Sequence, residues 1–342
     1  MAALICGSLA FDTIMHFEGR FKEQILAEQL HILNVSFLVP RLQRDFGGCA
    51  GNIAYSMKLL GAEPLPMATL GNDGASYLQR LQDLGISTKH ILTIEDTYTA
   101  QAMIMTDLDN NQITAFHPGA MMQAHALHVE KHPDIRLGII SPDGRDAMLS
   151  HAQQMAEAGI PFVFDPGQGL PMFDGQELRH FIELATWVTV NDYEGKMLSD
   201  RTGWSSAEIS SHVKGLIVTL GAQGCEVWQQ GHKHVVDPVK AQAVVDPTGC
   251  GDAWRGALLF GLEQGWDLLK CAELGNRVGA IKNSQSWPPK LPTDIKKTRC
   301  MHRVGSGRKS LTESVRALSL SEKAKQLVGS AWFVPHVALL KA

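Results

Sequence analysis

The sequence predicts an α/β protein built on a mainly parallel β-sheet with helices on both faces. Short, continuously apolar runs alternate with amphipathic segments of about a dozen residues, the pattern of buried parallel strands joined by helices. Strand and helix alternate too often for a β-sandwich or a helical bundle. The apolar runs lie at 2–8, 137–140, 160–164, 187–190 and 216–220, and the helical segments lie at 145–158, 176–185, 193–202 and 206–214.

Two stretches interrupt this alternation, from about residue 13 to 45 and from 97 to 118, and are predicted to form a small β-rich lid added to the edge of the sheet. The second contains two strands of alternating polarity joined by Asp109-Asn110-Asn111, which favours a turn. Lids on a rigid α/β scaffold often close over a substrate. A purely structural hairpin at the sheet edge would give the same pattern.

Composition indicates a large folded protein. The 342 residues are 44% hydrophobic and 19% charged, which suits a sizeable core and disfavours disorder. The net charge of −4 gives no general attraction for nucleic acid. There is no apolar run of about 18 residues for a membrane span and no basic N-terminal segment typical of a signal peptide. With six scattered cysteines that favour reduced thiols, we expect a cytoplasmic protein that binds neither nucleic acid nor membrane.

The charge is distributed unevenly along the chain. Residues 1–282 contain 20 Lys and Arg against 32 Asp and Glu, whereas residues 283–342 contain 11 against 3. An abrupt reversal of this kind can mark an interaction tail. We therefore predict one domain at 1–282 and a basic tail of different character at 283–342.

The segment from 244 to 261 carries the clearest chemical signal. It is predicted to run from a strand ending at Asp246, through a turn, into a helix opened by Gly249, Cys250 and Gly251. The glycines let successive backbone N–H groups converge and the helix dipole adds about half a positive charge, which predicts an anion hole. Asp252 follows in the first helical turn, where it could accept a proton from a hydroxyl attacking a phosphoryl group. The alternative is an ordinary helix cap.

Three further segments carry groups suited to a nucleotide or a sugar. Residues 46–54 combine a glycine pair with Asn52, whose amide can donate to and accept from vicinal hydroxyls. Asn191 and Glu194 lie where a strand gives way to a helix and could face phosphates and hydrated Mg²⁺, but a capping box uses the same residues. Residues 219–224 follow another strand, and their glycines could admit adenine or ribose, or form only a turn.

Taken together and in this order, the motifs resemble the ribokinase-like family of carbohydrate and nucleoside kinases over residues 2–282. Segments 46–54, 107–122, 164–170 and 246–252 are most similar to its bacterial and archaeal nucleoside kinases. The resemblance implies a three-layer α/β/α domain with a β-rich lid. It implies phosphorylation of the 5′-hydroxyl of adenosine, inosine or guanosine by ATP with Mg²⁺, as in purine salvage. It also implies a homodimer formed through the lid.

The resemblance assigns roles by position. Asp252 would be the catalytic base, with Gly249, Cys250 and Gly251 as the anion hole. The positions expected to contact the nucleoside are Asp12 and Asn52 at the ribose hydroxyls, Gly48 through its backbone, and Asn34, Gln112, Phe116 and Gln168 near the nucleobase or under the lid. The positions expected on the ATP side are Asn191, Thr219, Gly221 and Gly224, with Glu194 holding Mg²⁺ through water.

After Lys282 the sequence departs from the family, whose members continue with a glycine-rich loop beside the ATP base and a final helix. One codon choice for residues 283–294, shortened by a single A, reads IAKAGHQNYRPT, which is similar to that loop and helix start. This predicts that 283–342 result from a frameshift, natural or introduced by sequencing, which would also explain the charge reversal. If the tail is genuine, the adenine pocket loses a wall. A basic nucleic-acid arm is disfavoured because the tail has no regular alternation of aromatic and basic residues.

Two other functions are compatible with these residues. A ribose or fructose kinase would differ chiefly in the size of the pocket under the lid, and Phe116 with the long insert favours a nucleobase. A nucleoside-binding protein inactivated by its altered C-terminus would keep the substrate residues without competent ATP binding. The intact Asp252 and anion hole favour the enzyme.

Overall fold

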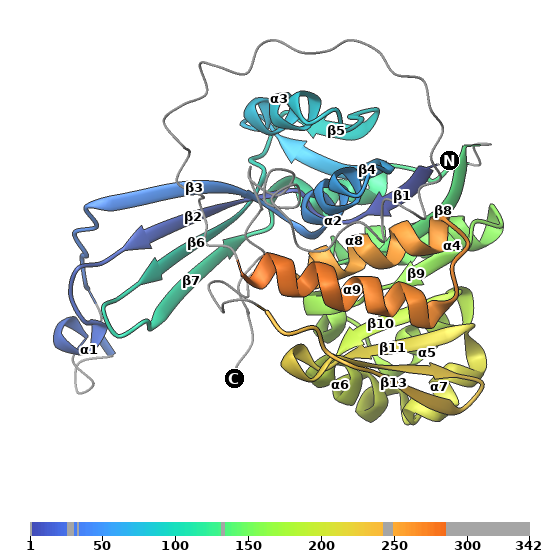
Figure 1. The fold of residues 1–342 in the computed structure, drawn as a ribbon. Coiled ribbons are helices and arrows are strands. Elements are labelled where there is room, and N and C mark those ends of the chain that lie inside the picture. Colours follow the sequence, from blue (N-terminus) through green and yellow to red (C-terminus); the bar gives the residue numbers. More distant parts are fainter. Residues whose placement is uncertain (1, 26–30, 33, 131–133, 242–248, 285–342) are drawn as a thin grey trace, which may run out of the picture.

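The computed structural model describes residues 2–25, 31–32, 34–130, 134–241 and 249–284. Its strands form two sheets, of nine and four strands, and helices cover both faces of the larger one (Figure 1). The predicted three-layer α/β/α fold with a mainly parallel sheet and a small β-rich lid is confirmed. The strand expected to end at Asp246 and the tail from 285 lie outside the described residues. Within those residues, no helix combines the length and apolar character that crossing a membrane requires.

The central sheet is parallel except at one edge. Its strands are β1 Ala2–Cys6, β4 Glu63–Gly71, β5 His90–Ile94, β8 Ile135–Ile140, β9 Phe162–Phe164, β10 Trp187–Asn191, β11 Gly215–Thr219, β12 Cys225–Gln229 and β13 His232–Val236. They lie in the order β13-β12-β11-β10-β9-β8-β1-β4-β5. Neighbours from β5 to β11 are parallel, whereas β12 and β13 add an antiparallel hairpin. The carboxyl ends of the parallel strands therefore share one edge.

Alternate side chains of the parallel strands supply two apolar cores, one on each face. In β1, Ala3 and Ile5 belong to the first core, and Leu4 and Cys6 belong to the second. The first core is covered by α2 Cys49–Leu59, α3 Ala75–Asp83, α8 Cys250–Glu263 and α9 Leu268–Asn283. The second is covered by α4 Arg145–Glu157, α5 Gly175–Leu184, α6 Asp192–Thr202 and α7 Ser206–His212.

The lid is a sheet of its own, whereas the sequence suggested an addition to the edge of the central sheet. Its strands are β2 Ala10–His16, β3 Arg41–Gly47, β6 Ala100–Thr106 and β7 Gln112–His117, in the order β3-β2-β6-β7. β2 follows β1 after a short loop, so the chain leaves the central sheet and the lid projects away from it (Figure 1). Register places Asp12 opposite Ala102 and Ala102 opposite Phe116. Asp12 and Phe116 therefore share one lid face.

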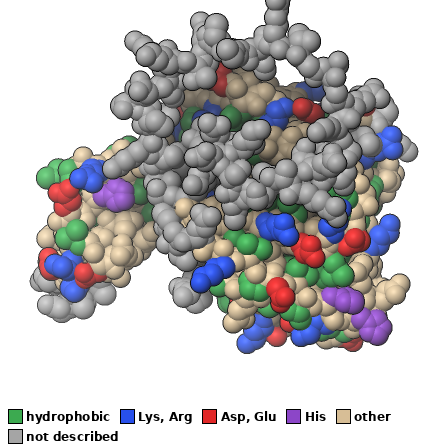
Figure 2. All heavy atoms as spheres, viewed as in Figure 1, with side chains coloured by type: hydrophobic (Ala, Val, Ile, Leu, Met, Phe, Trp, Pro, Cys, Tyr) green, Lys and Arg blue, Asp and Glu red, His purple; other side chains and the backbone are tan. Residues whose placement is uncertain are grey.

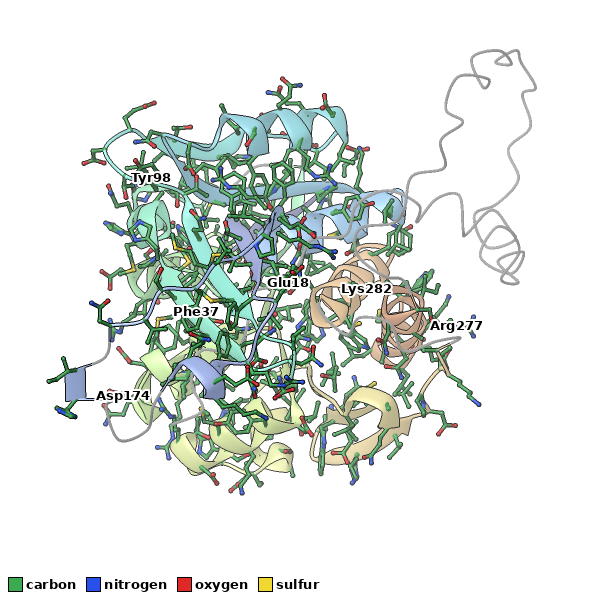
Figure 3. The ribbon with its side chains drawn as sticks, turned by 90° about the vertical axis from the view of Figure 1, so that its left-hand side faces the viewer. Glu18, Phe37, Tyr98, Asp174, Arg277 and Lys282 are labelled. Carbon is green, nitrogen blue, oxygen red and sulfur yellow. The ribbon has the colours of Figure 1, made fainter. Side chains whose placement is uncertain are left out.

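An aromatic cluster fixes the segment that precedes β3. The ring of Phe37 lies 4.9 Å from that of Phe17 and 5.4 Å from that of Phe21, the first residue of α1 Phe21–Gln24. Figure 3 views the molecule from the lid side, with Phe37 toward the viewer. Edge-to-face aromatic pairs of this kind contribute beyond simple burial. They hold the described part of the long insert against the lid.

Helices α2 and α8 pack closely because of Gly256. A Cβ added at Gly256 would lie 2.6 Å from Ser56 Cβ and 3.1 Å from the carbonyl oxygen of Ile53. Since the second neighbour is backbone, the helices would have to separate to admit a methyl group. By contrast, a Cβ added at Gly279 of α9 would find its nearest neighbour at 3.9 Å, an ordinary contact.

Gly256→Ala is expected to destabilise the protein by about 1–3 kcal/mol, because overpacking strains the α2–α8 contact. Gly279→Ala is the matched control and is expected to be neutral or stabilising by about 0.5–1 kcal/mol, since alanine suits a helix interior better than glycine. Urea denaturation of both variants measures the difference. Equal stabilities for the two variants would contradict the close packing.

Candidate active site

Polar residues follow the parallel strands at their shared carboxyl edge. Ser141 follows β8, Asp165 follows β9, and Asn191 ends β10. The amino end of α2 joins this edge, because the amide of Ala50 donates to the carbonyl of Ser8, 3.0 Å away. In open parallel sheets ligands bind beyond these ends, where loops and helix N-termini converge. The structure thus gathers polar residues at the edge where the topology predicts a ligand site.

Helix α8 brings Asp252 to this edge. Gly249 is the N-cap residue with φ of 74°, and the helix begins at Cys250. Asp252 lies in the first turn, and its Oδ2 accepts a 2.7 Å hydrogen bond from Asn52 Nδ2 of α2. No side chain caps α8, so the ordinary cap considered for Asp252 is not what the structure shows. The structure brings two residues from separate motifs, 200 positions apart, into direct contact.

Burial changes the acidity of Asp252. Loss of hydration raises the pKa of this carboxyl from 3.8 to about 7, and the negative charges of Asp165 and Asp12 act in the same direction. The hydrogen bond from Asn52 and the positive charge of Arg255 oppose the rise in pKa. A carboxylate whose pKa lies near neutrality can accept a proton and release it again under ordinary conditions.

A buried ion pair beside Asp252 was missed by the sequence analysis. Arg255 Nε and Nη2 donate to Asp165 Oδ2 and Oδ1 at 2.9 and 3.0 Å, and Nη2 lies 3.8 Å from Glu194 Oε2. Fork-shaped pairing of this kind is directional and strong. Asp165 could have been found, because it directly follows the apolar run of β9. Arg255 had no such signal, since its position within a helix predicts an exposed side chain.

Asn191 and Glu194 form the capping box that was the alternative for this motif. Asn191 Oδ1 accepts from the amide of Glu194, and Glu194 Oε2 accepts from the amide of Asn191, both at 2.8 Å. Desolvation raises the pKa of Glu194, and Arg255 opposes that rise. Glu194 Oε1 accepts no hydrogen bond from a described residue. No group of three or more His, Cys, Asp or Glu side chains is arranged to hold a metal ion in the described ranges.

Asp12 and Gly48 lie where lid and central domain meet. Asp12 is fully buried on β2. Gly48 is the N-cap of α2 with φ of 90°, and a Cβ there would lie 2.5 Å from the carbonyl oxygen of Ser8. Glycine is required at this position because both the conformation and the space exclude a side chain. Asn52 Oδ1 is buried without a partner among the described residues.

The predicted nucleobase residues are more scattered. Phe116 is half-buried on the lid face of Asp12, and Gln168 is exposed in the 3₁₀ helix η3 Gly167–Met172, just after Asp165. Gln112 is exposed at the far end of the lid, where it pairs with Thr106, and Asn34 is exposed in the segment before β3. Phe116 therefore shares the lid face of Asp12 and Gln168 follows Asp165 closely in the chain, whereas Gln112 lies at the far end of the lid.

The predicted ATP-side loop is a tight turn before β12. Thr219 Oγ1 lies 3.4 Å from the carbonyl of Val190, which ties the ends of β10 and β11. Gly221 and Gly224 have φ of 58° and 87° around the 3₁₀ helix η4 Gly221–Gln223. A Cβ at Gly224 would collide with the carbonyl of Val236, whereas one at Gly221 would meet open space. Gly224 is thus needed by the hairpin, and Gly221 leaves an uncrowded surface at the edge.

A second carboxyl at this edge was also missed. Asp143, two residues after Ser141, is buried, and desolvation raises its pKa to about 8. Its Oδ1 accepts from the amide of Gly144, while its Oδ2 has no partner among the described residues. The rule that residues just after the strands deserve inspection would have found it.

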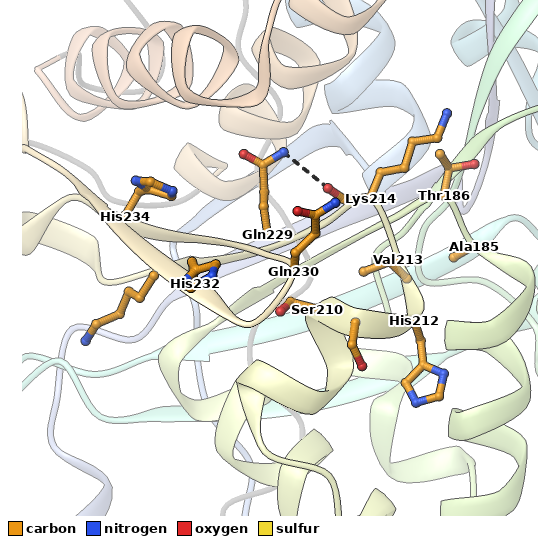
Figure 4. Close-up of a pocket in the computed structure, with 12 residues that line it drawn as sticks. Ala185, Thr186, Ser210, His212, Val213, Lys214, Gln229, Gln230, His232 and His234 are labelled. Atoms are coloured by element: carbon orange, nitrogen blue, oxygen red, sulfur yellow. Dashed lines mark hydrogen bonds between the residues drawn. The ribbon is translucent and has the colours of Figure 1, made fainter.

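A separate hollow lies on another edge of the central sheet. It has a volume of about 1120 Å³ and is lined by Thr186, Lys214 and the outer faces of α7 and the β12–β13 hairpin (Figure 4). Thr186 and Lys214 precede β10 and β11, so the hollow opens at the amino edge of the sheet. It is therefore on the opposite edge from Asp252 and holds none of the predicted site residues.

Known proteins resemble this chain in sequence and in fold. A nucleoside kinase of Burkholderia thailandensis, solved in complex with inosine, is 53% identical, with a TM-score of 0.74 over 83% of this chain and 91% of that chain. A nucleoside kinase of Methanocaldococcus jannaschii is 30% identical over 298 residues, covering 86% of this chain and 94% of the relative. A probable fructokinase-4 of Arabidopsis thaliana is 28% identical and covers 72% of this chain and 85% of its own length.

Residues 22–287, most of the chain, match the pfkB family carbohydrate kinases. The ribokinase-like fold, the relatives and this match agree. The chain is a kinase and belongs to the pfkB family.

Proposed function

We propose that this chain transfers the γ-phosphoryl group of ATP to the 5′-hydroxyl of a purine ribonucleoside: adenosine, inosine or guanosine. One observation carries the proposal. Asp252, desolvated in the first turn of α8 with a pKa near 7, lies beside the backbone of Gly249, Cys250 and Gly251. A proton acceptor next to a helix N-terminus suits the attack of a hydroxyl on a phosphoryl group.

In the proposed reaction the 5′-hydroxyl oxygen forms a bond to the γ-phosphorus while the bond to the β–γ bridging oxygen breaks. Asp252 takes the hydroxyl proton. The backbone N–H groups at the start of α8 stabilise the negative charge on the phosphoryl oxygens. Asn52 holds Asp252 in place through its Nδ2, which fixes the acceptor oxygen relative to the helix.

The sugar would lie between lid and central domain. Asn52 Oδ1, which has no partner within the described part of the chain, could accept from one ribose hydroxyl and Asp12 from another, with the backbone at Gly48 alongside. Phe116, on the same lid face as Asp12, would pack against the nucleobase. The structures of the Burkholderia thailandensis enzyme with inosine and with ADP-inosine support a purine nucleoside as the acceptor. Gln168 stays a secondary candidate, and Asn34 and Gln112 would need movement of the lid.

The nucleotide would lie along the ends of β10 and β11. Asn191, Thr219, Gly221 and Gly224 would flank ATP, and Glu194 Oε1 would accept from a water molecule on Mg²⁺. Bound Mg²⁺ would neutralise charge on the transferred phosphoryl group. A carboxylate oxygen with no partner among the described residues fits that role, since Mg²⁺ commonly keeps several waters.

A sugar kinase is the second candidate. The family description and the fructokinase relative favour it. A nucleoside-binding protein inactivated by its C-terminus is a third, since the frameshift that we propose after Lys282 would alter the adenine side. If mass spectrometry of the natural protein detects peptides from residues 283–342, the frameshift cannot be a sequencing error.

The test of function is ADP release from Mg-ATP by the purified 342-residue chain, with adenosine, inosine, guanosine, ribose and fructose offered separately. Turnover is expected with the nucleosides alone. Asp252→Asn is expected to lower kcat by about 100-fold or more, because the proton acceptor is lost, with nucleoside binding retained. Asp146→Asn, which removes an exposed carboxylate that lies 3.6 Å from Arg145, is the control for the loss of one negative charge. Turnover with sugars alone, or unchanged turnover in Asp252→Asn, would refute the proposal.

We also propose a homodimer through the lid face opposite Asp12. Leu42, Met103 and Ile113 are exposed on that face, where register aligns Leu42 with Met15, Met15 with Met105, and Met105 with Ile113. Apolar side chains reach the lid surface in Figure 2. Exposed apolar clusters commonly mark interfaces.

Ile113→Asp is expected to convert the dimer to a monomer, because the charge would be buried without a partner. Sedimentation velocity measures the change, and Val239→Asp, at an exposed apolar residue outside the lid, is the control. A monomeric parent protein, or an Ile113→Asp variant that still dimerises, would contradict the lid interface.

A further inference from the structure

The site contains more buried negative charge than its base requires. Asp12, Asp165, Glu194 and Asp252 are buried or largely buried, and Arg255 is the guanidinium among them. The pairing of Arg255 with Asp165 neutralises two buried charges, which is a structural role. A buried pair alone is weak grounds for stability, because desolvation offsets much of the attraction. The position of Arg255 therefore calls for a functional explanation.

One nitrogen of the Arg255 guanidinium makes no hydrogen bond to a described residue. Nε and Nη2 are taken up by Asp165, with Nη2 also 3.8 Å from Glu194. Nη1 donates to no described residue, although the side chain is only 7% exposed. It lies 3.3 Å from the position that a Cβ would occupy on Gly251. Because the guanidinium is planar, the Asp165 fork fixes the direction of Nη1 toward the first turn of α8.

We propose that Arg255 is a further phosphoryl-binding residue, whose Nη1 donates to the phosphoryl group held by Gly249, Cys250 and Gly251, with Asp165 as its positioning residue. The inference rests on the proposed kinase function. Gly251 leaves the path from Nη1 to that group clear. The helix N-terminus and the guanidinium together place positive charge where the transferred group develops negative charge.

The same guanidinium acts on the base. Its positive charge lowers the pKa of Asp252, against the desolvation that raises it. Arg255 keeps its own proton throughout, because Asp165 and Glu194 raise its pKa further. Loss of Arg255 would therefore weaken phosphate binding and leave Asp252 protonated at neutral pH, so that fewer molecules carry a competent base.

The experiment compares Arg255→Met, Arg255→Lys and the double variant Asp165→Asn/Arg255→Met. Arg179→Met is the control, because Arg179 also donates two hydrogen bonds but contacts the carbonyl of Thr202, away from the site. Calorimetry with inorganic tripolyphosphate measures phosphate binding without the adenine pocket, and kinase turnover is measured from pH 5 to 9. Circular dichroism and melting temperature report folding.

Arg255→Met is expected to weaken tripolyphosphate binding by about 10-fold or more and to lower kcat by about 100-fold or more. Nucleoside affinity should stay within about threefold, and the acid limb of the pH–rate profile should move to higher pH. Arg255→Lys should fall between Arg255→Met and the parent, because lysine keeps the charge without the fork. The double variant no longer buries an Asp165 carboxylate without its cation, so it should regain stability relative to Arg255→Met without regaining phosphate binding.

Recovery of tripolyphosphate binding in the double variant would show that the pair is only structural and would overturn the inference. So would parental binding in Arg255→Met. An inactive parent chain whose tripolyphosphate binding still depends on Arg255 would instead refute the proposed function and leave the phosphate contact standing. The two failures are therefore distinguishable.

Discussion

The hydrogen bond between Asn52 and Asp252 is the contact on which the site depends. It joins α2 to α8 across two motifs that are far apart in the chain. Gly256 lets the same two helices approach closely. Folding therefore desolvates a carboxyl and supplies it with an oriented donor. That combination gives Asp252 both a raised pKa and a fixed direction.

The surrounding charges are arranged around this carboxyl. Asp12 and Asp165 raise the pKa of Asp252, whereas Arg255 lowers it. Arg255 is itself held by Asp165 at the end of β9. One ion pair thus links the end of β9 to α8 and, through the charge of Arg255, opposes the rise in the pKa of Asp252. The capping box of Asn191 and Glu194 anchors the neighbouring helix at the same edge.

Much of the fold could be predicted from the sequence because the parallel strands are buried on both faces and appear as continuous apolar runs. β4 and the β12–β13 hairpin could not be found in this way. β4 contains Pro64 and Pro66, which disfavour a strand assignment, and β13 is largely exposed, so its sequence is polar. The lid strands were predicted, but a separate sheet follows from long-range pairing of β2 with β6, which no local pattern shows.

The site was predictable where short motifs meet strand ends, as with Asn52, Asp252 and Asn191. Arg255 and Asp143 were missed for physical reasons. The role of a buried arginine inside a helix can be inferred only once the structure shows its partner, here Asp165. Asn34 and Gln112 were assigned by resemblance alone, and both lie at exposed positions. Contacts made across the lid depend on tertiary arrangement, which sequence spacing does not encode.

The most direct test of this account is the pH dependence of the free energy of unfolding of Asp252→Asn relative to the parent, with Asp146→Asn as the control for lost charge. Because the pKa of Asp252 is raised from 3.8 to about 7 on folding, its favourable contribution is present below pH 4 and is lost as pH rises through 7. The asparagine side chain cannot ionise, so the free energy of unfolding of Asp252→Asn should exceed that of the parent by close to zero at pH 4. This difference in the free energy of unfolding should increase to about 2–4 kcal/mol by pH 8. A difference that is flat or falls between pH 4 and 8 would show that Asp252 ionises as easily in the folded protein as in the unfolded chain, and would contradict its role as a desolvated base.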